Sequence, residues 1–206
     1  MSLLLATGNK GKLAEFRSLL ANTTMVDATV YSPGDLSLEH LQVEETGTTF
    51  YENALLKAQA YVAASRRICV ADDSGLEVDA LGGRPGVHSA RYGGQALDDS
   101  GRCRHLLAEL GQLPPEARTA RFRCCLVAAA PDGRVGTVAG VCGGRILDCP
   151  VGEGGFGYDP VFLVREYGRS MADLSRAEKD AISHRGRALR ALVPILAETF
   201  PELLSN

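Results

Sequence analysis

The sequence has no excess of positive charge. Its 22 lysines and arginines are outnumbered by 25 aspartates and glutamates, which gives a net charge of −3 over 206 residues. Domains that bind duplex nucleic acid or anionic membranes usually carry a strongly basic surface. We therefore expect neither nucleic acid nor a membrane as a partner.

Long hydrophobic runs are also missing. No apolar segment approaches the roughly 18 residues that a membrane-spanning helix needs. The first apolar run, Leu3–Leu5, is short and no positive charge precedes it, so it does not resemble a secretion signal. We expect a cytoplasmic protein whose first strand is Leu3–Ala6.

The six cysteines include no C-x-x-C pair. Zinc sites need such repeated short spacings, and structural disulfides need an oxidising compartment. The sequence therefore predicts free thiols, some of them buried as small hydrophobic side chains.

Helical and strand patterns alternate early in the chain, whereas strands cluster later. This order predicts an α/β fold in which helices flank a mixed sheet, as one domain over residues 1–206. Expected strands are Leu3–Ala6, Met25–Tyr31, Ile68–Ala71, Thr119–Ala130, Val135–Val141 and Tyr158–Val164, with turns at Asp72–Gly75 and Pro131–Gly133. Expected helices begin at Gly11, Thr49, Asp98 or Asp99, Ser175 and Ser183, and the last is interrupted at Pro194. Thr49 and Ser175 each precede a glutamate by three residues, which is the spacing of a capping box.

Two glycine-containing loops deserve separate interpretations. Gly152–Gly157 matches G-x-G-x-x-G, but the following Tyr158–Phe162 is typical of a strand, so a dinucleotide site is not favoured. Thr7–Lys12 lies between a predicted strand and a predicted helix, where free N–H groups favour anions. On spacing alone, an anion site and a plain turn are equally good interpretations of this second loop.

Two acidic pairs, Glu44-Glu45 and Asp72-Asp73, lie in predicted turns. Carboxylates with room for water suit Mg²⁺, which shares its ligands with substrate phosphates. A solvated loop is the simpler interpretation of the first pair. The second follows a hydrophobic strand, where desolvating charge is costly, so a functional role is favoured there.

A basic group lies near the C-terminus, at Lys179 and in Ser183–Gly186. Such side chains can gather around an anion or a base carbonyl. A capped surface helix is the commoner reason for this pattern, and spacing alone leaves both open.

Together, six ordered segments resemble the inosine/xanthosine triphosphate pyrophosphatase family over about residues 3–190. They are Ala6–Lys12, Glu45–Ala54, Ala71–Leu76, Pro85–Tyr92, Gly155–Pro160 and Ile182–Gly186. The resemblance implies a long twisted mixed sheet with two lobes, an active site in the cleft between them, and a homodimer.

The resemblance also implies Mg²⁺-dependent hydrolysis of ITP, dITP and XTP to the nucleoside monophosphate and pyrophosphate. Asp73 would be the catalytic base, and Glu45 and Asp73 would ligate the metal. The implied substrate contacts are Thr7, Gly8, Asn9, Lys10, Gly11, Lys12, Lys57, Ser74, Phe156, Gly157, Tyr158, Asp159, Lys179, His184 and Arg185.

Two other functions stay open from the sequence. One is a pyrophosphatase for pyrimidine or modified-base nucleotides, and the other is a nucleotide sensor without turnover. Pyrophosphate release would separate an enzyme from a sensor, and base preference would separate the two pyrophosphatases. Selectivity for deaminated purines is expected at the purine 6-position, because a donor that pairs with a 6-carbonyl would be left unpaired by adenine.

Overall fold

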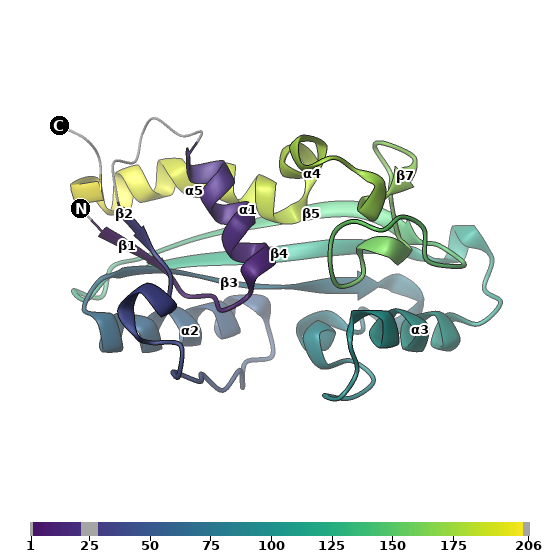
Figure 1. The fold of residues 1–206 in the computed structure, drawn as a ribbon, viewed down its shortest axis with the longest axis horizontal. Helices are drawn as coiled ribbons and strands as arrows, with labels where there is room; N and C mark the ends of the chain where they lie inside the picture. The colour runs from purple at the N-terminus through teal and green to yellow at the C-terminus, as the bar shows by residue number, and fades with distance from the viewer. Residues whose placement is uncertain (1, 22–28, 204–206) are drawn as a thin grey trace. The chain divides into compact units, whose positions relative to one another are not determined.

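The computed structural model describes residues 2–21 and 29–203. Within these residues, seven strands form one sheet in the order β2-β1-β3-β4-β5-β6-β7 (Figure 1). β1 pairs in parallel with β2 and β3, whereas β6 pairs antiparallel with β5 and β7. The predicted α/β fold with a mixed sheet and flanking helices is therefore confirmed. The strands are β1 Ser2–Leu5, β2 Thr29–Tyr31, β3 Ile68–Val78, β4 Thr119–Ala129, β5 Val135–Ile146, β6 Phe162–Val164 and β7 Arg169–Ser170.

The chain divides into two compact units. The first comprises Met1–Asp73, Cys124–Gly140 and Arg185–Asn206, and the second comprises Ser74–Arg123 and Val141–His184. Strands β3, β4 and β5 each contribute residues to both units. The expected cleft stays a prediction.

The first unit places helices on both faces of its strands. Helices α1 (Lys10–Ala21) and α5 (His184–Thr199) lie on one face, and α2 (Phe50–Ser65) lies on the other (Figure 1). Side chains alternate between faces along a strand, so Leu3, Leu5 and Val70 enter the core with α1 and α5. The same alternation sends the next residues along each strand toward α2.

The second unit has its own hydrophobic core. Helices α3 (Asp99–Leu110) and α4 (Arg176–Ile182) supply Leu106 and Ile182 to it, and the strands supply Phe122 and Phe162. The rings of Phe122 and Phe162 lie 4.6 Å apart between centroids. This unit carries the glycine loop and, of the predicted basic group, Lys179, Ser183 and His184.

Several local predictions are confirmed. Both capping boxes form, at the N-termini of α2 and α4, because each N-cap hydroxyl and each N3 glutamate satisfies a backbone N–H of the other. Helix α3 begins after its N-cap Asp98, and residues 131–133 turn the chain between β4 and β5. The six cysteines are free.

The predicted turn at Asp72–Gly75 is wrong, because β3 continues through it as an eleven-residue strand. Charged residues inside a strand are tolerated when each carboxylate finds a partner on its own face, and both aspartates do so here. Asp73, which was expected just beyond a strand, therefore lies within one.

Two further boundaries differ from the predictions. Tyr158–Val164 is not one strand: a 3₁₀ turn covers Asp159–Val161, and β6 follows. Pro160 has no N–H for a strand ladder, which fits the turn. Helix α5 continues through Pro194, since Leu192 and Leu196 on either side are held in the core.

The predicted strand Met25–Tyr31 is described only from Thr29, and its earlier residues lie outside the described part of the chain. Across residues 2–21 and 29–203, none of the helices combines the length and apolar character needed to cross a membrane.

Candidate functional site

A cavity of about 280 Å³ in the first unit collects several of the predicted site residues. The loop after β1 with the start of helix α1, the segment 41–45, helix α2 and strand β3 all contribute to its wall. The lining residues are Ala6, Thr7, Gly8, Asn9, Lys12, Leu41, Val43, Glu45, Lys57, Tyr61 and Asp72. Polar and charged groups converge here from four separate segments of the sequence.

The loop after β1 is organised by its own side chains. The backbone N–H of Asn9 donates to Thr7 Oγ1 (3.2 Å), and the N–H of Lys12 donates to Asn9 Oδ1 (3.1 Å). Asn9 thus caps helix α1, which begins at Lys10, so Lys10 and Gly11 lie in the first helical turn. A Cβ on Gly8 would meet no atom within 4 Å, so the exposed loop leaves room for a ligand beside it.

Asp72 lies in a buried cluster of charges. Its Oδ2 atom is 2.9 Å from Lys12 Nζ and 3.4 Å from Arg185 Nε, and Arg185 Nη1 is 3.0 Å from Glu15 Oε2. Burial alone would raise the pKa of Asp72, but the neighbouring Lys12 and Arg185 outweigh it and hold that pKa well below its ordinary value. Asp72 is therefore an ionised partner for two cations at neutral pH.

Asp73 faces helix α2 instead. Its Oδ1 atom is 3.5 Å from Lys57 Nζ, and its Oδ2 atom accepts a hydrogen bond from Asn53 Nδ2 at 3.2 Å. Lys57 Nζ also lies 2.8 Å from Glu45 Oε1. Burial raises the pKa of Asp73 above its ordinary value, Lys57 opposes that, and the Glu45 carboxylate adds to it. Asp73 is thus a better proton acceptor than Asp72.

Burial acts on Lys57 as well. Desolvation would lower its pKa, but the carboxylates of Asp72, Asp73 and Glu45 raise it above the ordinary value. The Lys57 ammonium group therefore stays charged between Glu45 and Asp73, the two carboxylates that the resemblance assigned to a metal.

The donor set fits Mg²⁺ shared with a substrate rather than a metal enclosed by protein. Glu45 and Asp73 meet at one ammonium group, which places two carboxylates side by side. Among the residues that the structure describes, no group of three or more His, Cys, Asp or Glu side chains gathers as a metal cage. Mg²⁺ commonly binds through one or two carboxylates plus phosphates and water.

Three predicted substrate contacts meet in the second unit. Asp159 Oδ2 lies 2.6 Å from Lys179 Nζ and accepts the Phe156 N–H at 2.9 Å. The same ammonium lies 4.7 Å from the centroid of the Phe156 ring. Asp159 and Lys179 are both buried, whereas Phe156 is half-buried. Asp159 therefore holds an aromatic ring and a cation next to each other.

The glycine loop is tied to its surroundings by hydrogen bonds to Asp99, Cys103 and Ser89, none of which was a predicted site residue. Asp99 accepts the Gly157 N–H at 2.7 Å, and Cys103 Sγ donates to the Gly157 carbonyl at 3.4 Å. Tyr158 donates its hydroxyl to the Ser89 carbonyl at 2.9 Å. These bonds fix the loop before any ligand arrives.

Gly155 is required by the same arrangement. Its φ is +75°, and a Cβ there would lie 2.2 Å from Asp159 Oδ2. Any side chain would displace the carboxylate that anchors Phe156 and Lys179.

The last predicted segment is divided between the two units. His184 is buried in the second unit with its ring stacked on Phe122 (centroids 4.9 Å apart, planes at 14°). Arg185 belongs to the first unit, in the cluster with Asp72 and Glu15. Ser74 is half-buried in β3, and its predicted contact with substrate stays a prediction.

Sequence reasoning missed Glu15 and Asn53, which hold Arg185 and Asp73. A signal for Glu15 was present, because it lies beside Phe16 on the apolar side of the predicted first helix. A carboxylate at such a position needs a cation, which the sequence cannot identify.

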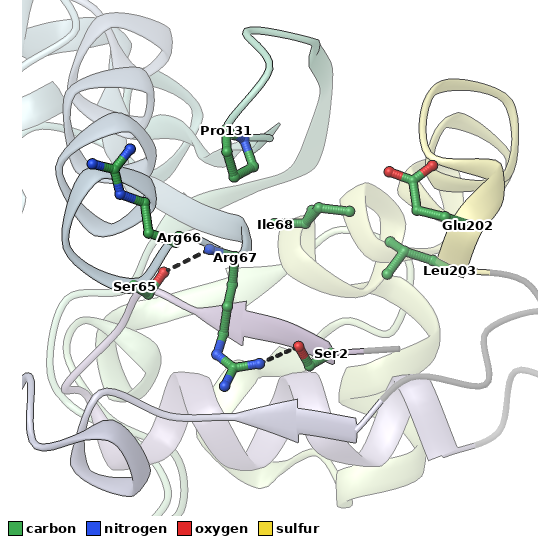
Figure 2. A pocket seen from close by; sticks show the side chains of 8 residues that line it. All are labelled: Ser2, Ser65, Arg66, Arg67, Ile68, Pro131, Glu202 and Leu203. Atoms are coloured by element: carbon green, nitrogen blue, oxygen red, sulfur yellow. Dashed lines mark hydrogen bonds between the residues drawn. The ribbon is translucent and has the colours of Figure 1, made fainter.

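A second cavity, of about 510 Å³, also lies in the first unit (Figure 2). Its lining is Ser2, Ser65, Arg66, Arg67, Ile68, Pro131, Glu202 and Leu203. Arg67 is already engaged there, since its side chain bonds to Ser2 and its guanidinium lies 4.9 Å from the Tyr31 ring centroid. Although it is larger, this cavity contains none of the predicted site residues, so the smaller one is the better site.

Comparison with known proteins relates this chain to one family over nearly its whole length. The model of the Ham1 family matches residues 3–195. The dITP/XTP pyrophosphatase of Geobacillus kaustophilus is 48% identical over 190 residues, covering 92% of this chain and 91% of that protein. The Bacillus subtilis dITP/XTP pyrophosphatase is 45% identical over 193 residues, covering 94% and 96%.

Solved structures show the same likeness. The Staphylococcus aureus Ham1 protein superposes with a TM-score of 0.85 at 39% identity, covering 96% of this chain and 99% of that one. A HAM1 protein from Coxiella burnetii gives a TM-score of 0.86 at 38% identity with the same coverage.

Proposed function

This chain belongs to the Ham1 family, and we propose that it hydrolyses dITP, XTP and ITP to the nucleoside monophosphate and pyrophosphate. The relatives named dITP/XTP pyrophosphatase support the reaction. The observation that carries the proposal is the meeting of Glu45 and Asp73 at Lys57 beside a polar cavity. We further propose Mg²⁺ as cofactor, a homodimer as assembly and the cytoplasm as location.

The triphosphate is assigned to the first unit. A nucleoside triphosphate carries about four negative charges, so its binding needs concentrated positive charge. Lys12, Lys57 and Arg185 supply three cations, and the first turn of α1 adds N–H groups beside the Thr7–Asn9 loop. Four carboxylates lie among them (Glu15, Glu45, Asp72 and Asp73), which leaves this group unable to neutralise a triphosphate alone.

That excess of negative charge is the reason to propose a divalent cation at Glu45 and Asp73. A bound Mg²⁺ would neutralise phosphate charge and make a nearby water more acidic. Lys57 forms ion pairs with both Glu45 and Asp73, and this keeps the two carboxylates close together. The two proposed ligands are therefore already near each other before a metal ion binds.

Asp73 is assigned as the general base for the attacking water. Its carboxylate is held on β3 by Asn53 and Lys57 rather than by a mobile loop. A fixed base increases the rate of such a reaction strongly, because it must lie within hydrogen-bond distance of the water whose proton it accepts. Asp72, one residue earlier, points to Lys12 and Arg185 and is occupied by them.

The purine base is assigned to residues of the second unit. The half-buried Phe156 ring can stack on a purine, and Lys179 beside it is a donor for a 6-carbonyl oxygen. Adenine presents an amine at that position, which cannot accept a hydrogen bond from this ammonium group. The loss of one buried hydrogen bond costs about 1–3 kcal/mol, and the upper end of that range corresponds to about a hundredfold discrimination.

A panel of nucleotides tests the proposed function. Pyrophosphate release from ITP, XTP, dITP, GTP, ATP and dUTP is measured with Mg²⁺ and with a chelator. We expect kcat/KM for ITP and XTP to exceed that for ATP, which lacks the 6-carbonyl, by about a hundredfold. GTP keeps the 6-carbonyl, so its discrimination is expected to depend on its 2-amino group. Equal rates on ATP and ITP would contradict the base preference, fast turnover of dUTP alone would indicate a pyrimidine enzyme, and full activity with chelator would exclude the metal requirement.

Replacing Asp159 with asparagine is expected to raise KM for ITP by about tenfold and to change kcat little. The substitution keeps the side chain's size but weakens its bonds to Lys179 and to the Phe156 N–H. Steady-state kinetics of Asp159→Asn measure both constants. Asp148→Asn, at a side chain that is 71% exposed in the same unit, is the matched control. A fall in kcat at unchanged KM would place Asp159 in the chemical step instead.

A further inference from the structure

Asn53 is a fully buried polar side chain in the first turns of helix α2. Asparagine is a poor helix former, and a buried amide lowers stability unless both of its ends are hydrogen-bonded. The catalytic residues that the resemblance implies do not include it. Its presence at a completely buried position therefore requires a reason in its contacts.

Both ends of the amide are used. Asn53 Oδ1 accepts the Gly47 N–H at 2.8 Å, and Asn53 Nδ2 donates to Asp73 Oδ2 at 3.2 Å. A backbone N–H can only donate and an ionised carboxylate can only accept. The two partners therefore fix the amide in one orientation, with its NH₂ group toward Asp73.

The Gly47 side of this bridge is tightly fitted. A Cβ on Gly47 would lie 2.6 Å from Glu52 Cβ and 2.7 Å from Asn53 Oδ1, so only glycine lets the loop approach the helix this closely. Glu45 is two residues away in the same loop and reaches Lys57. The hydrogen bond at Gly47 therefore restrains the segment that carries Glu45.

The Asp73 side is shared between two helical turns. Asn53 and Lys57 are four residues apart on α2 and lie on one helical face. They contact different oxygens of Asp73, Oδ2 and Oδ1 respectively. Two contacts on separate oxygens define the plane of the carboxylate, which one contact alone would leave free to rotate.

We propose that Asn53 is a positioning residue: its single amide fixes the orientation of the Asp73 carboxylate and the position of the loop that carries Glu45. Its consequence for catalysis rests on the proposed function, whereas its restraint of the loop does not. Loss of the amide would let the Asp73 carboxylate rotate and would remove the hydrogen bond that holds the Gly47 backbone. A misplacement of about 1 Å is enough to lower a rate strongly.

Two substitutions separate the bonds, and a third controls for stability. Asn53→Ala removes both bonds, and Asn53→Asp keeps an acceptor for the Gly47 N–H but loses the donor to Asp73. Ala58→Gly lies on the same helix at an equally buried position and lowers helix stability by about 1 kcal/mol without meeting Asp73. All three are compared by thermal melting, steady-state kinetics with ITP and backbone amide exchange.

We expect Asn53→Ala to lower kcat by about tenfold and to speed amide exchange over residues 44–48 in the free protein. Asn53→Asp should lower kcat while exchange at Gly47 stays slow, and Ala58→Gly should lower the melting temperature with kcat unchanged. Unchanged kcat in either Asn53 variant, or unchanged exchange in Asn53→Ala, would overturn the proposal. An equal loss of kcat in Ala58→Gly would show that Asn53 matters only for stability.

The two proposals fail in different ways. If the wild-type protein turns over none of the nucleotides, the proposed function fails, and the exchange measurement still tests the restraint on the loop. If the wild-type protein is active and Asn53→Ala retains its kcat, only the role of Asn53 fails.

Discussion

Asp73→Asn is expected to lower kcat by about 10²–10⁴-fold while the protein still folds and still binds nucleotide. Asparagine matches aspartate in size, and its carbonyl oxygen can still accept the Asn53 hydrogen bond. It has no negative charge and no basicity, so the water loses its proton acceptor. A weakened metal site would enlarge the loss further.

The measurements separate chemistry from binding and folding. Pyrophosphate release gives kcat, equilibrium titration with ITP gives the affinity, and urea unfolding gives the stability. Asp72→Asn is the matched control, because it makes the same change one residue away on the opposite face of β3. If Asp72→Asn lost more kcat than Asp73→Asn, the role of base would move to Asp72.

The sequence was most informative where chemistry is local. The capping boxes at Thr49 and Ser175 depend on residues three positions apart, and both form as predicted. The same holds for the turn at residues 131–133 and for the N-cap at Asp98. Such features need no knowledge of distant partners, so a local pattern is sufficient to predict them.

Strand β3 shows why the turn at Asp72 and Asp73 was mispredicted. Two adjacent carboxylates followed by serine and glycine are typical of a turn. The chain keeps them in a strand because Lys12 and Arg185 serve one carboxylate, while Asn53 and Lys57 serve the other. Those partners come from helices far away in the sequence, so no local pattern could reveal them.

For the site residues as well, the sequence indicated which residues matter but not which distant residues they contact. The resemblance identified Lys57, Asp159 and Lys179 by position, but not that Lys57 lies between two carboxylates or that Asp159 anchors Lys179. Arg185 was assigned to substrate, and the structure adds that it is also a structural partner of Asp72. Roles that depend on which charges meet require the three-dimensional arrangement.

Asp72→Asn is expected to lower the free energy of unfolding by about 3–5 kcal/mol at neutral pH. The substitution removes the charge that compensates the buried Arg185 and the partly buried Lys12. Arg185 keeps its ion pair with Glu15, so most of the loss of stability comes from the Lys12–Asp72 ion pair. Urea unfolding of both proteins at pH 7 measures the difference, and Asp35→Asn, at an exposed ion pair with Arg17, is a control expected to lose less.

The pH dependence provides a second check on the same substitution. The folded-state pKa of Asp72 lies below its unfolded value, so its contribution to stability is complete above about pH 4, the ordinary range of an aspartate. That contribution declines as the pH falls from there toward the folded-state pKa. The stability difference between wild type and Asp72→Asn should therefore be constant from pH 7 to about pH 5 and should shrink below pH 4. A difference that is small at pH 7, or that grows on acidification, would show that the Asp72 cluster does not stabilise the folded protein.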